Sequence, residues 1–139
     1  MINKKKLIEN IVNQPPINQN TEIDKKKTLA ENWFINLRDQ ICNNFTKIEC
    51  NFKLNNNNSE KVSEVKSPIF TKKKWDRDGG GGGVISIMKG DVFEKVGVNI
   101  STVYGKFSDK FKSQIPGAEK TGDFWASGIS VVAHMNNPF

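Results

Sequence analysis

The 139-residue sequence predicts an α+β fold, with a long helix first and several antiparallel strands after it. Apolar residues recur at helical spacing in the first third of the chain. Glycine, β-branched and aromatic residues dominate after Lys74, in segments of strand length. No clear helix separates these later segments, which disfavours a doubly wound parallel sheet. Hydrophobic residues make up 36% of the chain, enough for a modest core.

The helix is predicted to begin between Thr21 and Thr28 and to end near Phe45. Its apolar stripe repeats every four residues and comprises Leu29, Trp33, Leu37, Ile41 and Phe45, with Phe34 beside it. Thr28 and Glu31 have the spacing of a capping box near its start. Residues 1–20 contain two adjacent prolines and little apolar content, so we expect a weakly ordered tail before a domain over residues 21–139.

Alternation and β-branched content predict the strands. The predicted strands are Lys47–Leu54, Val84–Met88, Val98–Tyr104 and Gly128–His134. Asn55–Asn58 and the polar stretch to Ser67 are expected to form a loop, and Lys89 to Asp91 a turn.

Charge and composition exclude several functions. The net charge of +6 lies entirely within residues 1–74, and arginine, which reads base edges, occurs only twice. A basic nucleic-acid-binding module is therefore a weak alternative, and solvated lysine clusters explain the charge better. Cys42 and Cys50 are expected to be free thiols, and one histidine with two cysteines cannot build a four-ligand zinc site. No apolar run is long enough to cross a membrane, and no secretory signal is evident.

Five consecutive glycines form the most unusual feature, and they are Gly79, Gly80, Gly81, Gly82 and Gly83. They do not form a P-loop, because valine and isoleucine follow them in place of lysine and serine or threonine. A flexible linker is the alternative to a ligand-binding loop. Trp75 and Arg77 just before the run are poor linker residues and favour an ordered ligand loop.

The last predicted strand places Ser130, Val132 and His134 on one face and Ile129, Val131 and Ala133 on the other. Ser130 and His134 lie four residues apart, so about 13 Å separates their Cα atoms. That distance is too long for a nucleophile and its base, but it suits two contacts to one large, flat ligand. An ordinary polar strand face with a histidine near the rim is the alternative.

Three ordered segments carry a family resemblance. They are Trp75–Gly83 (WDRDGGGGG), Gly90–Ser101 (GDVFEKVGVNIS) and Phe124–His134 (FWASGISVVAH), followed by Asn137 and Pro138. Together they resemble the oxygen-dependent coproporphyrinogen III oxidase family, and the resemblance extends from about Leu29 to Phe139. It implies a heme-biosynthesis enzyme that uses O2 to convert two propionates of coproporphyrinogen III to vinyl groups, giving protoporphyrinogen IX.

The resemblance also implies a large antiparallel sheet flanked by helices, a cytoplasmic homodimer and no organic cofactor. It leaves a divalent metal such as manganese open. Ser130 matches a substrate-contacting serine of the family, and His134 matches a histidine assigned to metal or to the substrate cleft.

The family is about twice as long, and the resemblance covers only its N-terminal half. No catalytic residue is therefore expected in this chain, since the family's proton donor would follow Phe139. The alternative to an enzyme is an inactive fragment, or a split-gene half that folds or binds with a complementary C-terminal half.

Overall fold

The computed structural model describes residues 22–56 and 68–137, and it confirms the α+β fold. The elements in chain order are α2 (Glu22–Asn56), β1 (Thr71–Asp76), β2 (Gly81–Met88), β3 (Phe93–Lys106), α3 (Asp109–Lys112) and β4 (Asp123–Met135). The predicted tail over residues 1–20 and most of the predicted loop from Asn55 to Ser67 lie outside the described residues.

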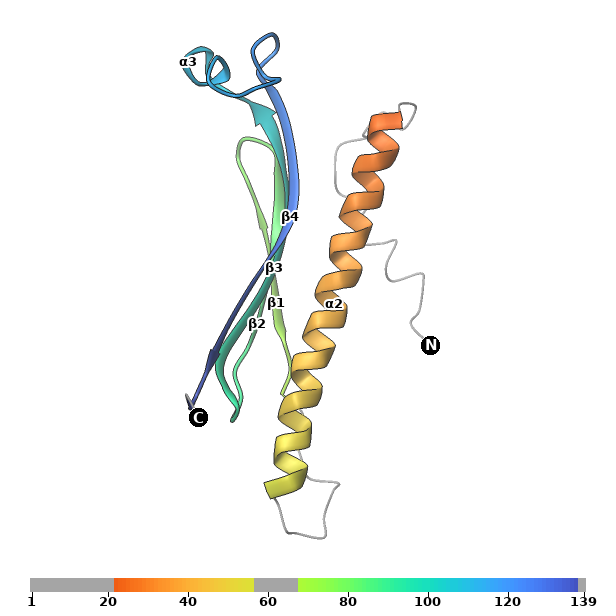
Figure 1. The fold of residues 1–139 in the computed structure, drawn as a ribbon, viewed down its shortest axis with the longest axis vertical. Helices are drawn as coiled ribbons and strands as arrows, with labels where there is room; N and C mark the ends of the chain where they lie inside the picture. The colour runs from red at the N-terminus through yellow and green to blue at the C-terminus, as the bar shows by residue number, and fades with distance from the viewer. Residues whose placement is uncertain (1–21, 57–67, 138–139) are drawn as a thin grey trace.

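The four strands form one antiparallel sheet in which each strand pairs with its neighbour in sequence, in the order β1-β2-β3-β4. Helix α2 runs along one face of this sheet, and α3 lies in the connection at one end (Figure 1). No element of the described ranges covers the opposite face (Figure 1). The arrangement is a two-layer helix-on-sheet structure with one face of the sheet open. Neither described helix is both long and apolar enough to cross a bilayer.

The core lies between α2 and the two central strands. Its buried members are Cys42 from α2, Met88 from β2, and Phe93, Val96 and Val98 from β3. Phe45 of α2 meets Phe93 edge-to-face, with ring centroids 5.0 Å apart. Burial also raises the pKa of the Cys42 thiol, so this free cysteine is a packing residue and a poor nucleophile.

The predicted strand Lys47–Leu54 is wrong, because α2 continues through this segment to Asn56. Glu49 and Lys53 lie four residues apart on one helical face and bind the connection between β2 and β3. The alternating apolar residues that suggested a strand stay largely exposed on the helix; Ile48, Phe52 and Leu54 are among them. The polar contacts of Glu49 and Lys53 thus favour a helix here, although apolar and polar residues alternate as in a strand.

The prediction that the apolar stripe of α2 packs against the core is only partly correct. A helix turns by about 100° per residue, so a spacing of four drifts by about 40° at each step. Ile41 and Phe45 pack against the core, whereas Leu29 and Trp33 are 69% and 60% exposed. The capping box is also wrong, because the helix begins at Glu22 and the Thr28 hydroxyl donates to the backbone oxygen of Asp24.

The three later predicted strands are confirmed, and each is longer than predicted. Strand β1 and the one-turn helix α3 were not predicted. Three consecutive lysines in β1 suggested solvated surface; they are exposed, but they stand on an edge strand, where lysine is a common residue.

Candidate functional site

The register of the sheet assigns each strand residue to one of two faces. Directly opposed residues share a face, and Val98 is opposite both Ser86 and Val131. Because Val98 and Ser86 are fully buried, this set faces α2. The alternate set points away from α2, and we call it the outer face. It comprises Thr71, Lys73, Trp75, Gly81, Gly83, Ile85, Ile87, Lys95, Gly97, Asn99, Ser101, Val103, Gly105, Phe124, Ala126, Gly128, Ser130, Val132 and His134.

The two predicted site residues of β4 both lie on the outer face. Ser130 is opposite Asn99 of β3, and His134 is opposite Lys95 of β3. Both side chains are exposed. A ligand lying along β4 can therefore reach both groups without meeting another described element.

The two faces of β4 were expected to differ in burial, with Ile129, Val131 and Ala133 buried, but they do not differ beyond Ile129. Ile129 packs against the core, but Val131 and Ala133 are exposed, as Ser130 and His134 are. The strand is at the edge of the sheet, and burial of both faces fades where α2 no longer covers it. The strand backbone alone makes successive side chains point to opposite faces. Their burial alternates only where another layer, such as α2, covers one face.

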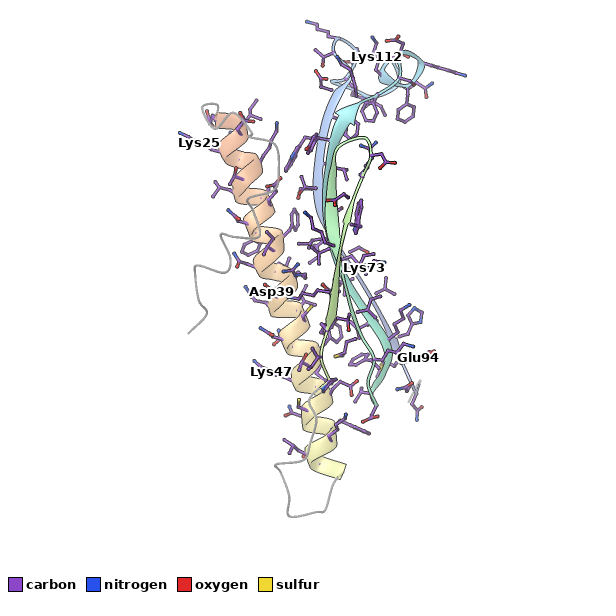
Figure 2. The ribbon with its side chains drawn as sticks, turned by 180° about the vertical axis from the view of Figure 1, so that it is seen from behind. Lys25, Asp39, Lys47, Lys73, Glu94 and Lys112 are labelled. Atoms are coloured by element: carbon purple, nitrogen blue, oxygen red, sulfur yellow. The ribbon has the colours of Figure 1, made fainter. Side chains whose placement is uncertain are left out.

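The outer face is rich in glycine and carries two lysines. Five of its positions are glycine, at Gly81, Gly83, Gly97, Gly105 and Gly128. The ionisable residues among its paired positions are Lys73, Lys95 and His134. Glu94 lies at the irregularity in the β3–β4 pairing, next to Lys95. Figure 2 shows it on the side of the sheet away from α2, so one acid accompanies the two lysines. Such a surface suits a flat, anionic ligand.

The glycine run is ordered, but it is not the loop that was predicted. Gly79 and Gly80 complete the turn after β1, and Gly81 to Gly83 begin β2. A Cβ at Gly81 would collide with the Thr102 carbonyl oxygen of β3. Gly80 and Gly81 also have positive φ, of 110° and 85°. Close packing of strands accounts for these glycines, and their role toward a ligand stays a prediction.

Arg77 holds this turn in place. Its guanidinium donates to the backbone oxygen of Tyr104 at 3.0 Å and lies 5.6 Å from the Phe124 ring centroid. Its backbone N–H donates to the Gly81 oxygen at 2.9 Å. The guanidinium is therefore already engaged within the turn between β1 and β2.

His134 does not have the neighbours that a metal ion requires. Within residues 22–56 and 68–137, no group of three or more His, Cys, Asp or Glu side chains could hold a metal. The residue opposite His134 is the cation Lys95, which repels a metal cation. The described donors by themselves do not form a manganese site, so we derive no step through one, and the metal role of His134 stays a prediction.

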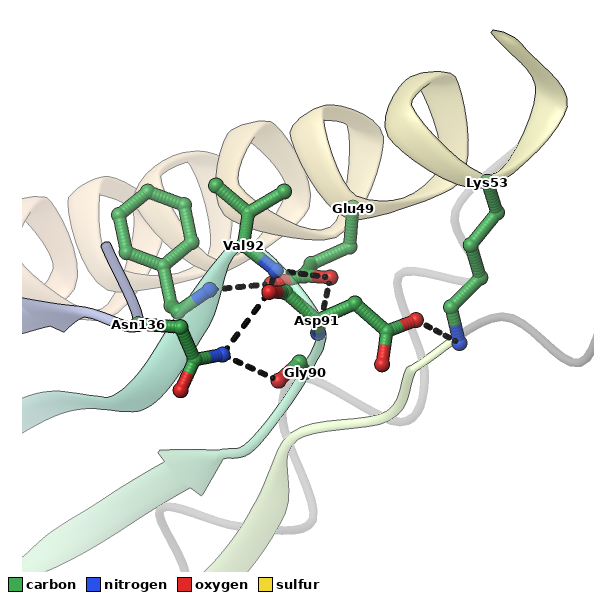
Figure 3. A network of polar contacts seen from close by, with 7 residues as sticks. Glu49, Lys53, Gly90, Asp91, Val92 and Asn136 are labelled. Carbon is green, nitrogen blue, oxygen red and sulfur yellow. Dashed lines mark hydrogen bonds and ion pairs between the residues drawn. The ribbon is translucent and has the colours of Figure 1, made fainter. Parts of the chain in front are cut away.

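A buried carboxylate fixes the loop that leads into β3 (Figure 3). Glu49 is 0% exposed and accepts hydrogen bonds from the backbone N–H groups of Asp91, Val92 and Phe93, the shortest at 2.8 Å. The side chain of Asn136 donates to the backbone oxygens of Gly90 and Asp91. These contacts tie α2, the β2–β3 loop and the end of β4 together, just beyond His134.

Sequence reasoning missed Glu49, Asn99 and Lys95. The spacing of Glu49 and Lys53 on a helix was a usable signal for the loop contact. Asn99 and Lys95 lie within Gly90–Ser101, one of the three segments that carry the resemblance, but only strand pairing brings them beside Ser130 and His134.

Comparison with known proteins identifies relatives of this chain. The model of the family described as coproporphyrinogen III oxidase matches residues 29–139. Proteins named oxygen-dependent coproporphyrinogen-III oxidase from Rickettsia bellii and Rickettsia felis are 52% and 51% identical to this chain over 114 residues. Each match covers 82% of this chain and 38% of the relative, so the chain spans little more than a third of their length.

Proposed function

This chain belongs to the coproporphyrinogen III oxidase family, and we propose that it forms part of the site of an oxygen-dependent enzyme of that activity. The substrate is coproporphyrinogen III, and O2 is the co-substrate. The reaction converts the ring A and B propionates to vinyl groups with loss of CO2. The family assignment also leaves the nucleic-acid-binding alternative without support.

The outer face is the observation that carries this proposal. Ser130 and His134 stand on it about 13 Å apart, on a glycine-rich surface that also carries Lys73 and Lys95. Coproporphyrinogen III is a large macrocycle with four propionates, so a broad surface with cations matches its shape and charge. In this proposal Ser130 contacts the substrate, and His134 lies beside it on the same face.

We propose further that this chain alone does not complete the reaction. Four carboxylates call for several charge-assisted partners, and arginine forks are the best of them. Arg38 is buried beside Asp39, and Arg77 is engaged with Tyr104. One exposed imidazole does not supply both proton transfer at the pyrrole and a closed site. A polypeptide that corresponds to the rest of the longer relatives would supply these groups.

The second candidate is a half that binds or assembles without contributing to turnover. The exposed outer face favours it, because an open surface binds a ligand without excluding water. Activity measurements separate the two candidates. The homodimer that the resemblance implies stays a prediction.

The test is an aerobic assay of coproporphyrinogen III with the purified chain, alone and with the remaining segment of the Rickettsia bellii relative. We expect product only in the mixture, and His134→Ala should lower the rate about tenfold or more. Met135→Ala, at the adjacent and also exposed position on the other face, is the matched control. A mixture without activity, or an unchanged rate for His134→Ala, contradicts the catalytic proposal.

A further inference from the structure

We propose that Asn99 and Lys95 of β3 hold carboxylates of the ligand beside Ser130 and His134. The inference deepens the proposed function, on which its choice of ligand rests. Asn99 is directly opposite Ser130, and Lys95 is directly opposite His134. Opposed residues on one face have Cβ atoms about 5 Å apart, so each β4 residue gains a close polar neighbour.

The side-chain amide of Asn99 is oriented by the protein. Its Oδ1 accepts a hydrogen bond from the backbone N–H of Ser86 at 3.3 Å. Nδ2 lies above Gly97, 3.7 Å from the position that a Cβ would occupy there. Within the described parts of the chain, no hydrogen bond uses Nδ2 as donor. Asn99 thus presents an oriented N–H donor on the outer face, which is what a carboxylate oxygen requires.

The backbone around Asn99 is open to a flat ligand. A Cβ at Gly128 would meet no atom within 4 Å, and one at Gly97 would meet only Nδ2 of Asn99. The two glycines flank the row that contains Asn99 and Ser130. A macrocycle can therefore approach the sheet closely while its carboxylates reach the polar side chains.

Lys95 supplies positive charge next to this donor. Its side chain is exposed, and no salt bridge within residues 22–56 and 68–137 engages it. The groups around it are His134 across the strand pair and Glu94 at the adjacent pairing irregularity. The other cation of the outer face, Lys73, lies in the same row as Asn99. Because Lys95 forms no salt bridge in the described parts of the chain, its ammonium group is available to pair with a ligand carboxylate.

The experiment measures binding of coproporphyrin III, a stable tetracarboxylate, to the purified full chain by its absorption shift. The tetramethyl ester of the same porphyrin, which lacks the charges, is the ligand control. We expect the acid to bind at least tenfold more tightly than the ester. Asn99→Asp keeps the acceptor for the Ser86 N–H but replaces the donor by an anion, and it should weaken binding about tenfold.

Lys95→Gln should weaken binding about three- to tenfold and reduce its salt dependence. Lys106→Gln is the matched control, because Lys106 is also an exposed lysine of β3 but lies on the face toward α2. It should change the affinity less than twofold. Circular dichroism checks that each variant remains folded.

Equal weakening by Lys95→Gln and Lys106→Gln, or equal binding of the acid and the ester, overturns the inference, as does a wild-type chain that binds neither. None of these binding results decides whether the combined polypeptides are enzymatically active, which the assay of the proposed function measures separately. Conversely, selective weakening by Asn99→Asp and Lys95→Gln supports the carboxylate site even where the combined polypeptides show no turnover.

Discussion

Glu49 is a fully buried acid whose charge is balanced by the polypeptide backbone. Three successive N–H groups of the β2–β3 loop donate to its carboxylate, at 2.8 to 3.3 Å. Hydrogen bonds to a charged acceptor are stronger than those between neutral groups, and a buried charge without them would be costly. Gly90 belongs to the same arrangement, since its missing side chain makes room for the carboxylate.

Gly90→Ala should therefore destabilise the chain. Its Cβ would fall on the Glu49 carboxylate, so that either the loop moves or hydrogen bonds are lost. We expect a loss of about 1–3 kcal/mol in urea unfolding. Gly128→Ala adds the same methyl group in open space and should cost less than about 0.5 kcal/mol. Similar losses for the two variants would show that the Glu49 contact does not constrain Gly90.

Glu31 is a second acid between α2 and the sheet, and it is poorly compensated. Its Oε1 is buried without a hydrogen-bond partner, and burial raises the pKa of this carboxyl, although a hydrogen bond with Thr102 and the charge of Lys27 oppose the shift. A raised pKa in the folded state means that the folded chain holds the proton more tightly than the unfolded chain. Stability from this group is therefore present at low pH and is lost as the pH rises through the folded-state pKa.

Glu31→Gln should remove the loss of stability that ionisation of Glu31 causes as the pH rises. The variant should be more stable than the wild type at pH 7, by about 1 kcal/mol or less, and the difference should shrink toward pH 4. Urea unfolding at both pH values measures it. A difference that grows toward low pH would contradict the sign of the shift.

At the scale of elements, α2 is held by scattered contacts of several kinds. Cys42 and Phe45 pack against the core, Asp39 pairs with Lys72 of β1 at 2.8 Å, and Glu49 binds the β2–β3 loop. The residues of the helix that contact the sheet thus include polar and charged groups. This explains why apolar spacing alone misjudged both its buried face and its end.

Substitutions along α2 should reflect this distribution. Phe45→Ala should cost about 2–4 kcal/mol, because the ring packs edge-to-face on Phe93. Trp33→Ala removes a larger side chain but should cost less than about 0.5 kcal/mol, because Trp33 is 60% exposed. Chemical denaturation of both variants provides the comparison. A larger loss for Trp33→Ala would place the packing face of α2 elsewhere.

At the scale of the whole molecule, the sheet has one covered face and two different edges. The β1 edge carries Lys72, Lys73 and Lys74, which discourage pairing with another strand. The β4 edge has no charged residue from Phe124 to Ala133, and Val132 is 51% exposed. The β4 edge and the outer face are therefore the surfaces open to further polypeptide.

We expect the isolated chain to self-associate through these surfaces. Val132→Lys should shift it toward monomer in sedimentation velocity experiments at micromolar concentration, because lysine opposes edge pairing and burial of the outer face. Ser113→Lys, an equal change of charge at an exposed site after α3, is the control. A wild-type chain that is monomeric, or equal effects of the two variants, would contradict this expectation.

The sequence alone determined the features that depend on local spacing. Local periodicity placed a helix first and located β2, β3 and β4, and it put Ser130 and His134 on a common face of β4. The family resemblance carried by the segments from Trp75 to His134 was also available from sequence, and comparison with relatives confirmed it.

Only the tertiary structure decided what depends on residues far apart in the chain. Glu49 needs N–H groups more than forty positions away, so its burial and the end of α2 near Asn56 could not be predicted locally. Strand register, set by long-range pairing, brings Asn99 to Ser130 and Lys95 to His134. Neighbours across a sheet are chosen by this pairing, and local spacing carries no information about it.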